Sequence, residues 1–116
     1  MAELTEKIAR YQEVLLSILE QEADTFPLQP ELEDQIIADT VRNHFQLVRT
    51  GWVKGSRIHE VLLQFDIKPS GKIWIQANLT ELHVEDELMK RRVPASDIVL
   101  GVQPPEYRQF TSFAMA

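Results

Sequence analysis

The sequence predicts an α+β fold: a four-stranded antiparallel meander sheet with an N-terminal helix and a shorter C-terminal helix packed on it. Two observations lead to this prediction. Residues 57–78 contain two runs of alternating apolar and polar residues joined by a Pro-Ser-Gly turn at residues 69–71, as in a β-hairpin. Residues 3–22 instead repeat apolar side chains every three or four positions, as in an amphipathic helix.

The composition indicates a single domain spanning residues 1–116. The chain is 44% hydrophobic and 26% charged, which is ordinary for a globular protein. Its formal net charge of −6 argues against a dedicated nucleic-acid-binding protein, because such proteins usually carry an excess of Lys and Arg. The absence of Cys excludes disulfides, thiol nucleophiles and Cys-based zinc sites. No apolar run approaches the ~20 residues of a membrane span, so we expect a soluble cytoplasmic protein.

The N-terminal helix should present one apolar stripe to the sheet. A coiled-coil strand is the alternative, but three turns of heptad-like spacing are too few to require it. Residues 23–32, with Pro27 and Pro30, then end the helix and form a crossing loop. The stripe consists of Leu4, Ile8, Tyr11, Leu15, Ile18 and Leu19.

Four strands should follow, joined by short loops into a meander. In the first strand, adjacent Ile36 and Ile37 leave the choice of buried face ambiguous. A polar loop at residues 53–56 separates the second strand from the third. The strands are expected over residues 33–41, 44–52, 57–67 and 72–78.

Alternation assigns the side chains of these strands to two faces. The predicted core face carries Val61, Leu63, Phe65, Ile67, Ile73, Ile75 and Ala77. The opposite face gathers Val48, Leu62, two tryptophans and several amides, a composition typical of a protein interface. The alternative is that a helix or the C-terminal tail covers this face within the monomer. The candidate partner-binding residues on it are Trp52, Gln64, Trp74, Gln76 and Asn78.

The C-terminal part should contain a helix over residues 81–92, with Thr80 as its N-cap. The basic residues at its end complement the helix dipole, and phosphate contact is the less favoured interpretation. Residues 96–100 form either a short extended segment or a helical turn. The tail at residues 104–116 is too rich in aromatic residues for disorder, so we expect it to dock on the domain or on a partner.

No catalytic residues, cofactor site or metal site are predicted. The histidines His44, His59 and His83 form no HxH or HxxxH pair. Asp66 and Lys68 match a minimal D-x-K nuclease pattern, in which a carboxylate holds Mg²⁺ and Lys polarises a phosphate. Such a short match is more often an exposed strand end.

Beyond these patterns, DIKPSGKIWIQANLTE at residues 66–81 resembles the signature of the XisI family, the fdxN-element excision controlling factors of cyanobacteria. The resemblance extends over nearly the whole chain. It includes VRNHFQLVRTGW at residues 41–52, RIHEVLLQFDIK at 57–68 and VPASDIVLGVQPPEYRQFTSFAMA at 93–116. The ordered combination of GKIWIQ, TE, IVLG and an FTSFA-type tail is specific, whereas any one piece alone is weak.

The chain departs from the family pattern at three places. Gln64 and Phe110 stand where members often have His and Tyr, and the turn at residues 68–71 looks one residue longer. The missing His weakens any catalytic hypothesis that rests on this strand. The resemblance implies a factor that acts with a site-specific recombinase and an XisH-like, nuclease-like partner in DNA-element excision during heterocyst development. It implies no catalytic residues and no cofactor.

The leading hypothesis is therefore a non-enzymatic accessory factor that binds an XisH-like protein. Homo-oligomerisation through an uncovered sheet face or edge strand is a further expectation left open. A metal-dependent nuclease using Asp66 and Lys68 is the third hypothesis. The second is direct DNA binding, which would use Arg42, Arg49, Lys54, Lys90, Arg91 and Arg92.

Overall fold

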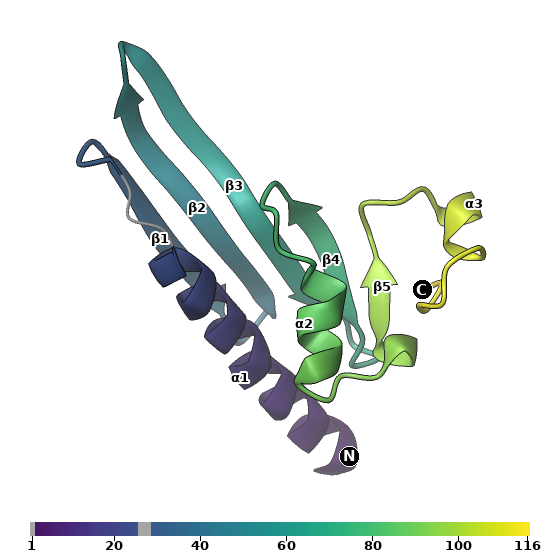
Figure 1. Cartoon of the computed structure of the whole chain (residues 1–116). Helices are drawn as coiled ribbons and strands as arrows, with labels where there is room; N and C mark the ends of the chain where they lie inside the picture. Colours follow the sequence, from purple (N-terminus) through teal and green to yellow (C-terminus); the bar gives the residue numbers. More distant parts are fainter. Residues whose placement is uncertain (1, 26–28) are drawn as a thin grey trace.

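A mixed five-stranded sheet in the order β1-β2-β3-β4-β5 forms the centre of the protein (Figure 1). The computed structural model describes residues 2–25 and 29–116. The strands are β1 (Leu32–Asp39), β2 (His44–Val53), β3 (Ser56–Ile67), β4 (Ile73–Asn78) and β5 (Ile98–Leu100). The helices are α1 (Ala2–Thr25), α2 (Val84–Lys90), the 3-10 turn η1 (Ala95–Asp97) and α3 (Pro105–Arg108).

The prediction of four purely antiparallel strands is wrong in one respect. The first four strands do form an antiparallel meander, but β5 adds a fifth strand parallel to β4. After β4 the chain returns along the helix-covered face of the sheet through α2 and η1. This crossover connection allows β5 to run in the same direction as β4. A strand of three residues is too short for alternation to reveal it.

The N-terminal helix is confirmed, and the second helix is shorter than predicted. α2 begins at Val84, and the N-cap position is His83, whose side chain makes no capping hydrogen bond. The predicted cap, Thr80, instead donates its hydroxyl proton to Asn78 Oδ1 over 2.7 Å. Of the predicted crossing loop, Pro27 lies outside the described residues and Pro30 lies in the turn before β1. No helix in the described part of the chain is long and apolar enough to cross a membrane.

Two bulges change the faces that alternation predicted. Between Leu47 and Val48 the β2–β3 register shifts, and β3 contributes one extra residue, Leu62. Leu62 is therefore buried in the main core, while Val61 lies opposite Val48 on the other face. The assignments of Val61 to the core and of Leu62 to the opposite face were wrong. A bulge cannot be inferred from a run of apolar residues such as VLL.

The second bulge lies in β4, where Gln76 is the extra residue. As a result, Ala77 pairs with Gln64 and Asn78 pairs with the core residue Leu63. Ala77 and Asn78 have thus exchanged the faces that were predicted for them. Asn78 is removed from the candidate partner-binding face.

One hydrophobic cluster joins α1 and α2 to the same face of the sheet. The largest fully buried side chains include Tyr11, Phe45 and Phe65. Burying side chains of this size stabilises the fold by about 2 kcal/mol each, so this face fixes the positions of both helices. The helical members of the cluster are Tyr11, Leu15, Ile18, Leu19, Val84 and Leu88.

Tyr11 also makes the polar connection between α1 and η1. Its hydroxyl donates to Asp97 Oδ2 over 2.5 Å, and Lys7 Nζ lies 3.0 Å from the same oxygen. Burial, followed by the hydrogen bond to Asp97, raises the pKa of the Tyr11 phenol above its ordinary range. The folded protein therefore favours the neutral phenol.

The raised pKa of Tyr11 predicts a loss of stability in alkaline solution. Above about pH 10 an unfolded tyrosine loses its proton while the folded one keeps it, so the free energy of unfolding falls by at most about 1.4 kcal/mol per pH unit. Tyr11→Phe should make this fall shallower. Urea unfolding of both proteins from pH 8 to pH 11 measures it, and equal slopes would contradict the assignment.

The β2–β3 hairpin closes with a two-residue turn, tighter than the four-residue loop predicted. Lys54 and Gly55 have φ values of 50° and 80°, as expected for the turn type that matches the twist of paired strands. A second glycine in this hairpin, Gly51, has φ 149° and lies against β1. A Cβ atom built on Gly51 would lie 2.1 Å from the carbonyl oxygen of Glu31. Only glycine allows β1 to approach this closely.

Gly51→Ala should therefore destabilise the protein by about 3 kcal/mol or more, because it adds backbone strain and forces β1 away from β2. Gly55→Ala is the matched control: its φ is also positive, but no atom lies within 4 Å of the added methyl group. Its cost should be only about 1 kcal/mol. Urea unfolding at neutral pH compares the two variants. Equal destabilisation would show that the contact with Glu31 is unimportant.

Candidate functional site

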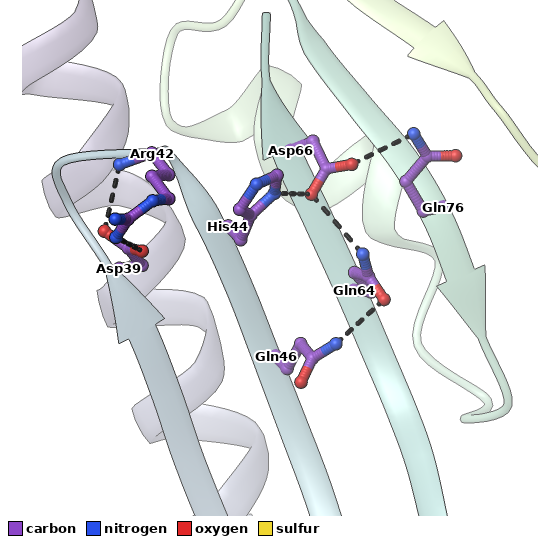
Figure 2. Close-up of polar contacts among 7 residues, drawn as sticks. All are labelled: Asp39, Arg42, His44, Gln46, Gln64, Asp66 and Gln76. Atoms are coloured by element: carbon purple, nitrogen blue, oxygen red, sulfur yellow. Dashed lines mark hydrogen bonds and ion pairs between the residues drawn. The ribbon is translucent and has the colours of Figure 1, made fainter.

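The outer face of the sheet, turned away from α1 and α2, carries a connected set of polar side chains (Figure 2). Asp66 on β3 is its centre. His44 Nδ1 lies 2.9 Å from Asp66 Oδ1, and Gln76 Nε2 donates to Asp66 Oδ2 over 3.1 Å. Gln64 Nε2 donates more weakly, over 3.4 Å, and its Oε1 accepts a 3.0 Å hydrogen bond from Gln46. We refer to these five residues as the Asp66 network.

The strands explain why the network forms. His44 pairs directly with Asp66, and Gln46 pairs directly with Gln64, so both pairs have their side chains on one face. The bulge in β4 brings Gln76 to the other oxygen of Asp66. A carboxylate as buried as Asp66 requires several polar partners to replace lost water, and His44, Gln64 and Gln76 are those partners. The network therefore gives the outer face a fixed, mainly amide-lined surface.

The network does not supply a cluster of metal ligands among the described residues. Within residues 2–25 and 29–116, no group of three or more His, Asp or Glu side chains is placed to hold a metal ion. The two residues of the nuclease hypothesis also have separate surroundings. Asp66 contacts two amides and His44, whereas Lys68 Nζ lies 5.2 Å from the centre of the Trp74 ring. Asp66 and Lys68 thus have different partners.

The C-terminal tail packs on Trp74, one of the predicted partner-binding residues, and leaves it half-buried. The guanidinium carbon of Arg108 lies 4.9 Å from the centre of the Trp74 ring. Arg108 is buried, and its Nε donates to the carbonyl oxygen of Leu100 over 3.2 Å. The backbone nitrogen of Ala114 donates to Ile98 O over 2.9 Å, which places the tail along β5. The tail therefore docks on its own domain and covers the β4–β5 part of the outer face.

Trp52 lies at the opposite end of the outer face and is 56% exposed. It belongs to the β2–β3 hairpin, which extends beyond the end of α1 (Figure 1). Arg57 packs over it, with its guanidinium carbon 5.8 Å from the ring centre, and also donates to Thr50 Oγ1 over 3.0 Å. The structure thus divides the predicted set: Gln64 and Gln76 join the network, Trp74 is half-buried beneath Arg108, and Trp52 remains exposed.

Several cations proposed for DNA contact are held by carboxylates. Arg49 forms a two-point ion pair with Asp34, with distances of 2.8 and 3.1 Å, and this pair raises the pKa of Arg49. Arg91 and Lys90 both lie near Glu87, at 3.2 and 4.0 Å. These pairs reduce the positive charge offered to phosphates.

Arg42 is paired in the β1–β2 turn. Its backbone nitrogen donates to Asp39 Oδ1 over 2.9 Å, and its guanidinium NH1 donates to Asp39 Oδ2 over 3.1 Å. These hydrogen bonds, led by the one from the backbone of Arg42, lower the pKa of Asp39. Asp39 therefore stays ionised beside Arg42.

Comparison with known proteins shows the family of this chain. The model of a family described as XisI protein matches residues 5–115. The chain belongs to the XisI family. No curated protein matches it significantly.

Two solved XisI structures have the same fold. An XisI-like protein from Anabaena variabilis is 41% identical, with a TM-score of 0.89, and the match covers 94% of this chain and 99% of the other. The fdxN element excision controlling factor XisI from Anabaena variabilis is 31% identical, with a TM-score of 0.83 and coverage of 95% and 99%.

Sequence reasoning missed the Asp66 network in this XisI-family protein. His44 was considered as a possible metal ligand and Asp66 as part of a D-x-K pattern, so the two residues were not paired with each other. The signal was the equal two-residue spacing of His44 and Gln46 on β2 and of Gln64 and Asp66 on β3. Recognising it required the β2–β3 register, which pairs them in order.

Asp66→Asn should weaken the fold by about 1–3 kcal/mol, because an amide NH₂ would face groups that now donate to a carboxylate. Glu13→Gln, at an exposed position of α1, is the control and should change stability by less than about 0.5 kcal/mol. Chemical denaturation measures both variants. An Asp66→Asn protein as stable as the Glu13→Gln protein would show that the network contributes little.

Proposed function

We propose that this XisI-family protein is a non-enzymatic accessory factor in the programmed excision of a DNA element. In this proposal it binds an XisH-like protein and acts with a site-specific recombinase. The name of the 31%-identical relative, an fdxN element excision controlling factor, supports the role in excision. The Asp66 network supports a binding role, because its groups satisfy one another and provide a fixed polar surface.

The exposure of Trp52 is the observation that most favours a protein partner. A tryptophan at the end of an extended hairpin, stacked by Arg57, loses little conformational freedom on binding and has a large area to bury. Trp and Arg are also the residues most often found at the energetic centres of protein interfaces. We therefore place the partner on the hairpin half of the outer face.

Direct DNA binding has less support. The net charge is −6, and Arg42, Arg49 and Arg91 are each paired with a carboxylate. Self-association through the β1 edge or the outer face is a further alternative, because β1 is an edge strand of the sheet. A gel-shift at low salt and light scattering of the isolated protein test these two alternatives.

Co-expression with an XisH-like protein, followed by size-exclusion chromatography at micromolar concentration, tests the proposed function. We expect one complex, and Trp52→Ala should weaken its affinity at least about tenfold because an interface centre would be lost. Tyr107→Ala is the matched control, since Tyr107 is also 56% exposed but lies on α3 at the other side of the molecule (Figure 1). Separate elution of the unmodified proteins would reject the proposal.

A further inference from the structure

A second surface lies on the opposite side of the sheet, beside the helices. A hollow of about 520 Å³ lies between the C-terminal part of α1, the β2–β3 hairpin and the segment after β4. This volume is within the range of pockets that hold small ligands. Among the described residues, its apolar lining includes Leu47, Leu62, Leu79 and Leu82, and its polar lining includes Glu22, Arg49, Thr80 and Glu81.

The segment 79–82 forms one wall of the hollow, and hydrogen bonds fix its shape. The Leu79 backbone nitrogen donates to Leu62 O over 2.8 Å. Asn78 Nδ2 donates to Leu82 O over 2.9 Å, and Asn78 Oδ1 accepts from the backbone nitrogen of Thr80 over 2.9 Å. This wall is therefore formed before any ligand arrives, which lowers the entropy lost on binding.

The Leu79 side chain is not part of the hydrophobic core cluster. It is 68% exposed at the mouth of the hollow, although the backbone on both sides of it is held in place. Leu47 and Leu62 are buried and close the base. An exposed leucine on a rigid wall, above an apolar base, provides a contact for an apolar side chain of another molecule.

The charge around the hollow is negative. Of the lining residues that the structure describes, Arg49 is the one cation, and Asp34 already binds two of its nitrogens. Glu22 and Glu60 lie close enough to interact electrostatically with the same guanidinium, and Glu81 adds a carboxylate to the lining. These four carboxylates outweigh the one guanidinium, so the surroundings favour a cationic ligand.

We propose that this hollow binds a short segment of a protein partner in which apolar side chains are flanked by Lys or Arg. The apolar side chain would contact Leu79 and Leu62, and the cationic group would reach Glu22 or Glu81. The inference does not depend on the excision role or on Trp52, because the hollow is on the other face of the sheet.

Titration of the full-length, ¹⁵N-labelled protein with three synthetic hexapeptides tests the proposal. The first peptide contains two leucines and two lysines, the second has glutamates in place of the lysines, and the third has serines in place of the leucines. We expect only the first to shift the NMR signals of Leu62 and residues 79–82, and binding should weaken several-fold when salt rises from about 50 mM to about 500 mM. No shift at these residues at millimolar peptide would overturn the proposal.

Charge reversal and matched controls sharpen the test. The double variant Glu22→Lys with Glu81→Lys should lose binding of the lysine peptide and gain binding of the glutamate peptide. Leu79→Ser should weaken the lysine peptide at least fivefold. The controls Glu13→Lys with Glu106→Lys, and Val41→Ser, change exposed residues elsewhere and should bind as the unmodified protein does.

Three results would count against the proposal. The first is equal binding by the charge-reversed and control proteins, and the second is unchanged affinity in Leu79→Ser. The third is that spermidine shifts these NMR signals while none of the peptides does. The last result would indicate a site for small amines. Heat denaturation of each variant establishes that it is folded before the titration.

Discussion

The pairing of β3 with both β2 and β4 is the constraint on which the rest of the structure depends. One face of this central strand buries Leu63 and Phe65 against α1 and α2, while the other carries Gln64 and Asp66. The bulges that interrupt the two pairings determine which neighbouring residues join each face. The positions of Leu62, Gln76 and Asn78 all follow from these two irregularities.

The β4 bulge contributes a residue to each of the two surfaces proposed for binding. On the outer face, the β4 bulge turns Gln76 toward Asp66 and completes the polar network. On the helix side, it turns Asn78 toward Thr80 and Leu82, where its side chain fixes the wall of the acidic hollow. Substitutions at either residue should therefore affect one surface and leave the other largely intact.

Burial and charge give the two surfaces different chemistry. The outer face is lined by amides and ends in the exposed Trp52, so it favours a large and mainly neutral contact. The hollow is smaller, has leucines at its base and carries an excess of carboxylates, so it favours a basic and apolar segment. A partner that wraps around the hairpin would contact both.

The sequence alone determined the N-terminal helix, the meander, most of the core and the family. These features depend on local periodicity, on turn residues such as Gly71 and on an ordered string of motifs, all of which are visible along the chain. The tertiary structure alone decided the parallel β5, the packing of Arg108 on Trp74, the Asp66 network and the acidic hollow. Each of these joins residues from separate elements through strand register or chain crossing. A shift of one residue in register reverses the face of every following side chain, and alternation by itself does not reveal where such a shift occurs.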